Sequence, residues 1–105
     1  MKKYGVHFLA EAVDDLDALF CYIADESSYK IADRYLARIE RLCRSLESFP
    51  QRGTAVAGTV PGLRTMGFER RATILFHVGE DRVEILRVYY GGQDLGPELK
   101  RLLGI

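Results

Sequence analysis

Two periodicities of apolar residues run along the first half of the chain, and they predict a short strand followed by two helices. Val6 and Phe8 alternate with other residue types within Tyr4–Leu9, as in a strand. The next segment has one apolar stripe at helical spacing, formed by Val13, Leu16, Phe20 and Ile23. A second helix is predicted from Tyr29 to Ser48, with Ser28 as its N-cap. Its apolar stripe consists of Ala32, Tyr35, Leu36, Ile39, Leu42, Leu46 and Phe49.

Strand patterns fill the second half of the chain, after a loop at residues 51–62 that is rich in Gly, Thr and Ala. We expect strands at Leu63–Phe68, Ala72–Val78 and Val83–Tyr90. The last of these has apolar residues on both faces, which is typical of a strand in the centre of a sheet. A closing helix is expected at Leu95–Leu103.

The order of these elements is β-α-α-β-β-β, which predicts an α+β fold. A short link between two amphipathic helices favours an antiparallel helical hairpin, and its apolar side must be buried against another layer. We therefore expect a helical hairpin packed on a small antiparallel sheet, with a short C-terminal helix. The length of 105 residues fits a single domain, residues 1–105.

Charge and hydropathy restrict the classes of function. Fifteen Lys and Arg residues balance fifteen Asp and Glu residues, so the chain lacks the basic excess that is common in nucleic-acid-binding proteins. A chain without net charge associates readily, and we expect a protein partner. No apolar run approaches the ~20 residues of a membrane helix, and no signal peptide is visible. The expected location is therefore cytoplasmic, without a membrane partner.

The residues that hold metals or cofactors do not form a recognisable site. Cys21 and Cys43 have no Cys-x-x-Cys spacing and fall at different heights of the helical hairpin, so we expect two reduced thiols. His7 and His77 are single residues on separate strands, where packing explains them. The loop from 53 to 62 lacks the Lys-Ser/Thr pair of a phosphate-binding loop. We expect no metal and no cofactor.

Several segments, taken in order, resemble the RelE/ParE superfamily of toxins from type II toxin–antitoxin systems. The resemblance covers nearly the whole chain, and its strongest part is VEILRVYYGGQDL at Val83–Leu95, which is similar to the closing strand of ParE-type, plasmid-stabilisation toxins. The other matching segments are Ala12-x-x-Asp15-Leu16, Tyr22-Ile23-Ala24, Ala32-Asp33-Arg34-Tyr35-Leu36, Leu46–Gly53 and Pro61-Gly62-Leu63-Arg64.

This resemblance implies a small toxin that is neutralised by a cognate antitoxin, in a hetero-oligomer. The superfamily contains two mechanistic groups. RelE-like members are endoribonucleases that cut mRNA on the ribosome, whereas ParE-like members share the fold, lack the nuclease residues and inhibit DNA gyrase. The choice between them depends on whether the residues for phosphodiester cleavage are present.

Three positions at which the nuclease group carries chemistry are occupied here by other residues. Thr73 stands where the resemblance places an arginine, and a neutral hydroxyl cannot stabilise the charge of a phosphorane as a guanidinium does. Gly91 and Gly92 stand where a second arginine is expected, and Pro97 lies near the position of a terminal tyrosine. These departures favour a protein that is not an enzyme.

An enzymatic alternative remains open at this point. Arg87-Val88-Tyr89-Tyr90 is similar to the terminal Arg-x-His-Tyr of another interferase subgroup, with Tyr89 at the histidine position. The unperturbed pKa of tyrosine is near 10, so Tyr90 is suited to be an acid and poorly suited to be a base. The catalytic set in that interpretation is Arg64, Arg71, Arg87 and Tyr90.

The leading hypothesis is a ParE-type toxin that binds an antitoxin and inhibits DNA gyrase. A third interpretation is a member that keeps the fold and antitoxin binding but has lost toxicity. The expected target-binding residues are Arg64, Arg87, Tyr89, Tyr90, Asp94 and Leu95. The expected antitoxin-binding residues are Tyr22, Tyr29 and Tyr35. The adjacent Arg70 and Arg71 form a basic pair at a strand entry.

Overall fold

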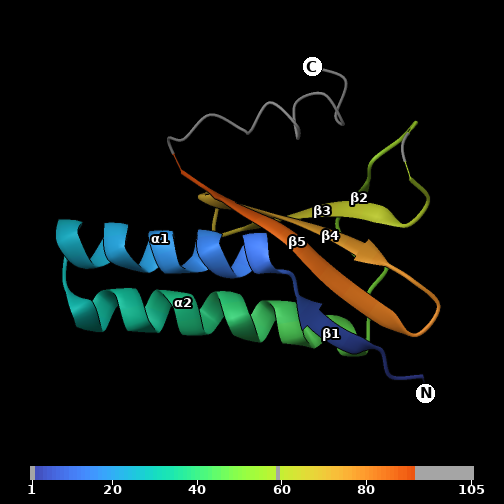
Figure 1. The fold of residues 1–105 in the computed structure, drawn as a ribbon, viewed down its shortest axis with the longest axis horizontal. Coiled ribbons are helices and arrows are strands. Elements are labelled where there is room, and N and C mark those ends of the chain that lie inside the picture. Colours follow the sequence, from blue (N-terminus) through green and yellow to red (C-terminus); the bar gives the residue numbers. More distant parts are fainter. Residues whose placement is uncertain (1, 59, 92–105) are drawn as a thin grey trace.

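The computed structural model describes residues 2–58 and 60–91, and it confirms the α+β fold. Two antiparallel helices form one layer and a twisted sheet forms the other (Figure 1). The elements are β1 (Gly5–Phe8), α1 (Ala10–Glu26), α2 (Tyr29–Arg44), a 3-10 turn (Ser45–Glu47), β2 (Thr54–Ala55), β3 (Leu63–Phe68), β4 (Ala72–Val78) and β5 (Arg82–Tyr90). The expected closing helix at Leu95–Leu103 lies outside the described residues.

The sheet has five strands in the order β1-β5-β4-β3-β2 and is mixed. The three C-terminal strands pair antiparallel, as predicted, but β1 runs parallel to β5, with Val6 opposite Val83. A parallel pair needs a long connection, and the helical hairpin with the other strands provides it. The loop at 51–62 also contains an unpredicted element, the two-residue strand β2, in which Thr54 pairs with Thr65.

Local sequence signals set the ends of the helices. The Ser28 hydroxyl accepts a hydrogen bond from the backbone N–H of Ile31 at 3.1 Å, which confirms the predicted N-cap of α2. The helix ends at Arg44, four residues before the predicted end, and continues as the 3-10 turn. Phe49 was expected in the core, but 62% of it is exposed. No helix within the described residues is long and apolar enough to span a membrane.

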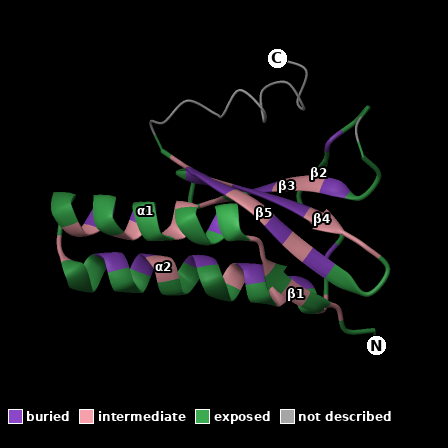
Figure 2. Ribbon diagram, viewed as in Figure 1, coloured by how far each residue is buried: buried purple, intermediate pink, exposed green. Residues whose placement is uncertain are grey.

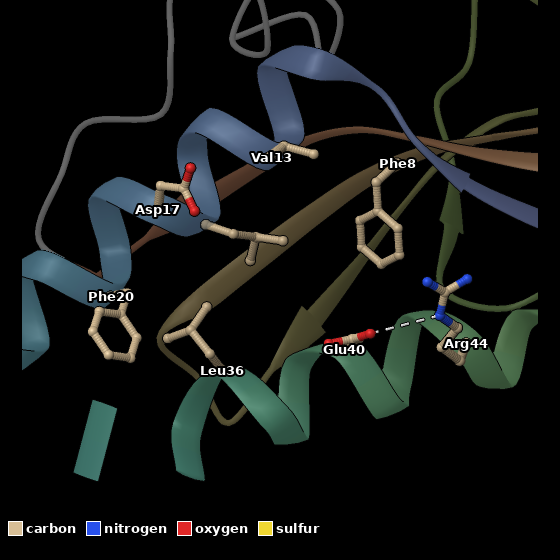
Figure 3. A pocket seen from close by; sticks show the side chains of 8 residues that line it. Phe8, Val13, Asp17, Phe20, Leu36, Glu40 and Arg44 are labelled. Carbon is tan, nitrogen blue, oxygen red and sulfur yellow. Dashed lines mark ion pairs between the residues drawn. The ribbon is translucent and has the colours of Figure 1, made fainter. Parts of the chain in front are cut away.

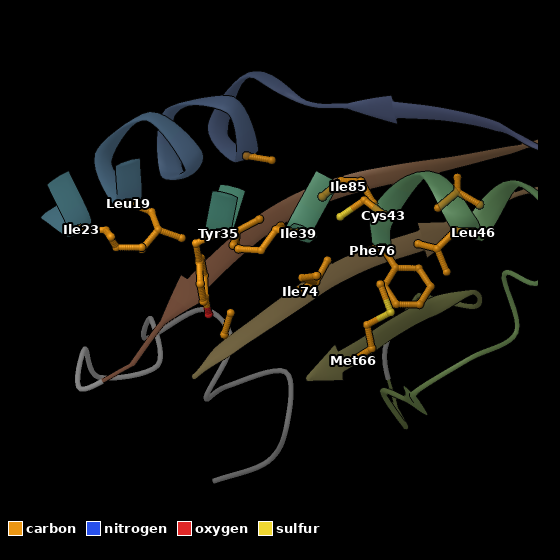
Figure 4. Close-up of a cluster of buried hydrophobic side chains, with 14 of the residues drawn as sticks. Leu19, Ile23, Tyr35, Ile39, Cys43, Leu46, Met66, Ile74, Phe76 and Ile85 are labelled. Atoms are coloured by element: carbon orange, nitrogen blue, oxygen red, sulfur yellow. The ribbon is translucent and has the colours of Figure 1, made fainter. Parts of the chain in front are cut away.

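The main core lies between the helices and one face of the sheet (Figure 4). On α1 the buried residues are Ala12, Leu19 and Ile23. Ile23 belongs to the predicted stripe, whereas the other two each lie one position before a residue of that stripe. Val13 is 43% exposed because the apolar arc of α1 is wider than its contact with the sheet. Buried residues from α2, the 3-10 turn, β3, β4 and β5 complete this cluster, on the side where the helices and the sheet face each other (Figure 2): Ala32, Tyr35, Ile39, Cys43, Leu46, Met66, Ala72, Ile74, Phe76, Val83, Ile85 and Val88.

A smaller apolar cluster covers the opposite face of the sheet. It contains Leu75 of β4 and Tyr89 of β5, and Val56 from the loop packs onto it with Leu63. The backbone N–H of Val56 donates to the carbonyl of Leu63 at 2.9 Å, which fixes the loop over this face. β5 contributes apolar residues to both clusters, and it lies between β1 and β4, so the prediction of an interior strand is confirmed.

The two cysteines have different environments, and their reactivity is expected to differ. Cys21 is exposed, whereas Cys43 is fully buried, and burial raises the pKa of its thiol to about 12. Because the thiolate is the reactive form, a disulfide reagent at neutral pH should modify Cys21 promptly and Cys43 only after unfolding. Thiol titration with and without denaturant measures this, and prompt reaction of both thiols in the native chain would contradict it.

Candidate functional site

The C-terminal end of β5 and the turn between β3 and β4 enclose a cavity of about 220 Å³, called here the strand-end pocket. It brings the basic pair Arg70 and Arg71 next to Thr73, Tyr89 and Tyr90. Both arginines are exposed, and neither guanidinium has an ion pair or hydrogen bond within the described residues. The remaining lining residues are Gly67, Ala72 and Gly91.

A strained turn presents the basic pair. Glu69 and Arg70 both have positive φ angles, 51° and 61°, which are unfavourable for residues with a Cβ atom. Two consecutive left-handed residues are the backbone of a tight hairpin turn that usually contains Asn-Gly. The turn is closed by the Arg71 N–H, which donates to the carbonyl of Phe68 at 3.1 Å. A charged side chain therefore occupies a position at which glycine is more stable.

Replacing Arg70 by glycine is expected to raise the free energy of unfolding by about 1 kcal/mol, because glycine adopts positive φ without strain. Arg70→Ala is the matched control, since it removes the same charge but keeps the strain. Chemical denaturation of the three proteins measures the effect. Equal stability of the glycine and alanine variants would contradict the strain argument.

The two tyrosines of β5 lie on opposite faces of the sheet. Tyr90 is partly buried on the helix side, with its ring centroid 5.9 Å from that of Tyr22 and 5.8 Å from that of Tyr35. Tyr89 is buried in the smaller cluster and is only 7% exposed, with the Arg87 guanidinium 5.2 Å above its ring. Packing against the two faces of the sheet accounts for the position of both rings, and both residues also line the strand-end pocket.

Arg87, a predicted target-binding residue, is held by an acidic side chain of α1. Its Nε and Nη2 atoms donate to the two carboxylate oxygens of Asp15 at 2.8 and 3.0 Å. The same carboxylate accepts the backbone N–H of Val88 at 2.8 Å. β1 pairs with β5 only as far as Ile85, so Asp15 continues the hydrogen bonding along this edge. Asp15 belongs to the pattern Ala12-x-x-Asp15-Leu16, but that pattern does not predict its contact with Arg87 and Val88.

A β-bulge brings β5 into this position. Leu75 of β4 is opposite Arg87 and Phe76 is opposite Ile85, so Leu86 is an extra residue on β5. A bulge of this kind changes the direction in which the following side chains point. It places the Arg87 guanidinium beside Asp15 at the end of the strand pairing between β1 and β5.

Arg64, the other predicted cation, is bound by the loop that precedes β2. Its Nε donates to the carbonyl of Arg52 at 2.7 Å, and its other nitrogens lie 3.4 Å from Gln51 Oε1 and the Gly53 carbonyl. Arg64 pairs with Phe76, whereas Tyr90 pairs with Ala72, four residues away along β4. At ~3.3 Å per residue, the Cα atoms of Arg64 and Tyr90 are separated by about 13 Å or more.

The residues of the enzymatic alternative are thus divided among three places. Arg71 and Tyr90 share the strand-end pocket, while the guanidinium groups of Arg64 and Arg87 bind carbonyl and carboxylate groups of the chain itself. Asp94, Leu95, Gly92 and Pro97 lie outside the described residues. Within the described part of the chain, no group of three His, Cys, Asp or Glu residues is arranged to hold a metal ion.

The two histidines have different settings. His77 Nε2 lies 3.0 Å from the carbonyl oxygen of Pro61 and its Nδ1 lies 4.0 Å from Glu84, so the expectation of a packed, hydrogen-bonded side chain is confirmed. His7 is exposed on β1, which corrects the expectation that it packs on a strand face. Neither of them lines the strand-end pocket.

A second feature is a groove of about 360 Å³ between α1, α2 and β1, called here the helix groove. Phe8, Val13, Phe20 and Leu36 line it (Figure 3), together with Leu16. Asp17 lies on its α1 side. On its α2 side Arg44 pairs with Glu40 at 3.8 Å and donates to the carbonyl of Val6 at 3.3 Å.

The two helices differ in the charge of their exposed faces. α1 exposes acidic residues and α2 exposes basic residues, and none of the ion pairs found among residues 2–58 and 60–91 joins the two helices. The idea that the helices neutralise each other is therefore not realised as direct ion pairs. The charged groups that line the groove are Asp17 on α1 and the Glu40–Arg44 pair on α2, so an apolar groove with few free charges remains, which suits the apolar face of a peptide.

The predicted antitoxin-binding tyrosines surround the loop between the helices. Tyr22 is 54% exposed and Tyr29 is 72% exposed, and the Tyr29 ring packs on Phe20 with centroids 5.0 Å apart. The ring of Tyr35 is instead buried against Phe68, with centroids 5.4 Å apart, so only its hydroxyl end is near the surface cavities. Tyr22 and Tyr29 are accessible to a partner over their rings, whereas Tyr35 is mainly a core residue.

Comparison with known proteins agrees with this geometry. The family model of the ParE toxin of the type II toxin–antitoxin system parDE matches residues 6–95. Toxin ParE3 of Caulobacter vibrioides is 32% identical over 85 residues, which are 81% of this chain and 84% of that protein.

Two solved structures share the fold. A chromosomal ParDE toxin–antitoxin system from P. aeruginosa superposes with a TM-score of 0.72 at 23% identity, covering 85% of this chain and 97% of that one. The RelBE2 toxin–antitoxin complex of Mycobacterium tuberculosis superposes with a TM-score of 0.67 at 23% identity, covering 89% and 97%. With its helical hairpin on a mixed sheet and a sequence match over most of its length, the chain belongs to the ParE toxin family of type II toxin–antitoxin systems.

Proposed function

We propose that this toxin inhibits DNA gyrase in the cytoplasm and that a cognate antitoxin neutralises it. The choice of gyrase as the target rests on the hydrogen bonds that two arginines make. Arg64 and Arg87, which an interferase would need for the phosphorane, are bound by the chain's own carbonyl and carboxylate groups. Phosphodiester cleavage needs cations aimed at the reacting phosphate, so this arrangement favours a binding protein.

The proposed gyrase-binding surface is the strand-end pocket with the exposed Arg70 and Arg71. Both arginines are exposed and line one pocket with Tyr90, and neither guanidinium has an ion pair or hydrogen bond among the described residues. Arginine and tyrosine are enriched in the contacts that dominate binding energy in protein interfaces. Arg64 and Arg87 are expected to act as positioning residues, which hold the loop before β2 and the end of β5.

Gyrase supercoiling by the purified chain, run beside mRNA cleavage in a translation extract, tests the target. Inhibited supercoiling with intact mRNA is the expected result, and Arg71→Ala should weaken it by at least about tenfold, as for a central interface arginine. Arg82→Ala, an exposed arginine at the other end of β5, is the matched control. Active gyrase with cleaved mRNA would overturn the proposal.

A ribosome-dependent mRNA interferase is the second candidate, because Arg70, Arg71 and Tyr90 line one pocket. In that case Tyr90→Phe should abolish most of the cleavage, since it removes the proposed acid and keeps the ring. For a gyrase inhibitor the same change should have little effect. A chain that leaves growth, gyrase and mRNA unaffected would instead be a member that has lost toxicity.

The helix groove is the proposed antitoxin site, occupied by an amphipathic segment of the antitoxin. Its apolar lining, from Phe8, Val13, Phe20 and Leu36 among others, supports this assignment. Val13→Lys places a charge on the floor and should abolish rescue by the co-expressed antitoxin while toxicity persists. Ala18→Lys makes the same charge change at an exposed position of α1 outside the groove and should leave rescue intact. Equal rescue of both variants would exclude this groove.

A further inference from the structure

A third cavity, of about 430 Å³, lies where the loop between α1 and α2 approaches the end of β5 and the turn after β3. We call it the hairpin-tip hollow. Its volume is within the range of specific ligand pockets, and it shares the lining residues Arg71 and Tyr90 with the strand-end pocket. Its lining consists of Tyr22, Ile23, Glu26, Ser27, Ile31, Tyr35, Arg38, Glu69, Arg71 and Tyr90.

The wall of this hollow contains a buried hydroxyl without a partner. Tyr35 extends from α2 with its oxygen at the far end of the side chain (Figure 4), and the residue is only 8% exposed. Its hydroxyl oxygen has no hydrogen-bond partner within the described residues. A buried polar group in this state costs free energy, and such groups usually mark a site that a water molecule or a ligand completes.

This hydroxyl is a donor at neutral pH. Burial raises the pKa of Tyr35 to about 12, and the nearby Tyr90 and Glu69 act in the same direction. The group therefore stays protonated and can donate a hydrogen bond to an acceptor that enters the hollow. An acceptor with negative charge forms the stronger bond.

The charges around the hollow favour one carboxylate over a polyanion. Arg38 and Glu69 neutralise each other through two hydrogen bonds of 2.9 and 3.1 Å, and this pairing lowers the pKa of Glu69. The Arg71 guanidinium has no ion pair or hydrogen bond among the described residues, so its N–H groups are available to donate to a carboxylate. Glu26 also lines the hollow, and its charge would repel the repeated phosphates of a nucleic acid more strongly than a single carboxylate.

We propose that the hairpin-tip hollow is a carboxylate-binding site for an Asp or Glu side chain of a peptide partner. The carboxylate accepts hydrogen bonds from the Tyr35 hydroxyl and the Arg71 guanidinium, and the rings of Tyr22 and Tyr90 cover its apolar stem. The identity of the partner as the antitoxin rests on the proposed function, whereas the carboxylate chemistry rests on these side chains alone.

The test is an NMR titration of the full-length chain, labelled in its tyrosine rings and arginine side chains. The probe is a blocked tripeptide, acetyl-Ala-Glu-Ala-amide, at millimolar concentrations. We expect saturable shifts of the Tyr35 and Arg71 signals. The neutral glutamine analogue should bind at least about tenfold more weakly, because it cannot form charge-assisted hydrogen bonds. Inorganic phosphate is titrated separately to distinguish a phosphate site.

Variants assign the binding to the two donors. Arg71→Gln should abolish the shifts, whereas Arg70→Gln, which removes the same charge one residue away and outside the hollow, should retain them. Tyr35→Phe should weaken binding without lowering the Tm of the free chain, because its hydroxyl has no partner to lose. A lowered Tm with unchanged binding would show that the hydroxyl has only a structural role.

The proposal is overturned if neither residue shifts, if the glutamine peptide binds as well as the glutamate peptide, or if phosphate binds more tightly than both. These outcomes are separate from the target assignment, since gyrase and mRNA assays contain no such peptide. A failed titration with inhibited gyrase would remove only the carboxylate site. A successful titration with uninhibited gyrase would remove only the proposed target.

Discussion

Asp15→Ala is expected to lower the free energy of unfolding by roughly 3 kcal/mol, a large fraction of the stability of a small domain. One carboxylate accepts three hydrogen bonds, two from Arg87 and one from the backbone N–H of Val88. Its removal leaves a buried backbone donor and a half-buried guanidinium without their acceptor, and each of these losses is costly. Thermal and chemical denaturation measure the effect.

A neighbouring acid provides the control for this prediction. Asp14→Ala removes an equal charge from an exposed position on the same helix turn and should change stability by less than about 0.5 kcal/mol. In a double-mutant cycle with Arg87→Ala, the two substitutions should be strongly non-additive. Equal effects of Asp14→Ala and Asp15→Ala would show that the carboxylate does not hold the end of β5.

Gly53→Ala is the second change with a large expected effect, a loss of about 3 kcal/mol or more. Gly53 has a φ of 71°, and an added Cβ atom would lie 1.9 Å from the carbonyl oxygen of Thr65. The strand pair of β2 and β3 would have to separate there, and the contact of Arg64 with this loop would be disturbed. Denaturation and the backbone NMR signals of β3 report both consequences.

A substitution at a second glycine distinguishes the effect of the steric contact at Gly53 from the effect of backbone strain. Gly58 has a similar φ of 73°, but an added Cβ atom there has nothing within 4 Å. Gly58→Ala should therefore cost only the strain of a left-handed residue, about 1 kcal/mol. The excess loss in Gly53→Ala is the contribution of the close backbone approach, and equal losses at both positions would contradict it.

The elements with strong periodicity were predictable from the sequence. The two helices, the three C-terminal strands and the Ser28 cap follow from residue spacing and local chemistry, and the structure confirms them. The parallel pairing of β1 and the short β2 were not predictable, because strand partners depend on contacts between distant residues. The buried positions of α1 differ from the predicted stripe for a related reason. The sheet and α2 contact different sides of the wide apolar arc of this helix.

Some residues of the candidate site could be named from the sequence, but not whether their side chains are free to bind a partner. From the sequence, target binding is assigned to Arg64, Arg87 and the end of β5, whereas Arg70 and Arg71 are interpreted mainly as a basic pair at a strand entry and Arg71 enters only the enzymatic alternative. The structure brings Arg71 and Tyr90 together in one pocket. The sequence could not show that Arg64 and Arg87 are already bound, because Arg52 and Asp15 are 12 and 72 residues away from them. It also could not show that the hydroxyl of Tyr35 is buried without a partner.

The Asp15 contact also determines how other chains can approach the sheet. A strand with unpaired N–H groups is a template on which another polypeptide can add, and long open edges lead to aggregation. Beyond Ile85 the Asp15 carboxylate occupies the Val88 donor, and at the opposite end of the sheet β2 offers only two residues. The contact therefore removes one donor from the part of the β5 edge that β1 leaves uncovered, and it shortens the edge on which an added strand could pair there.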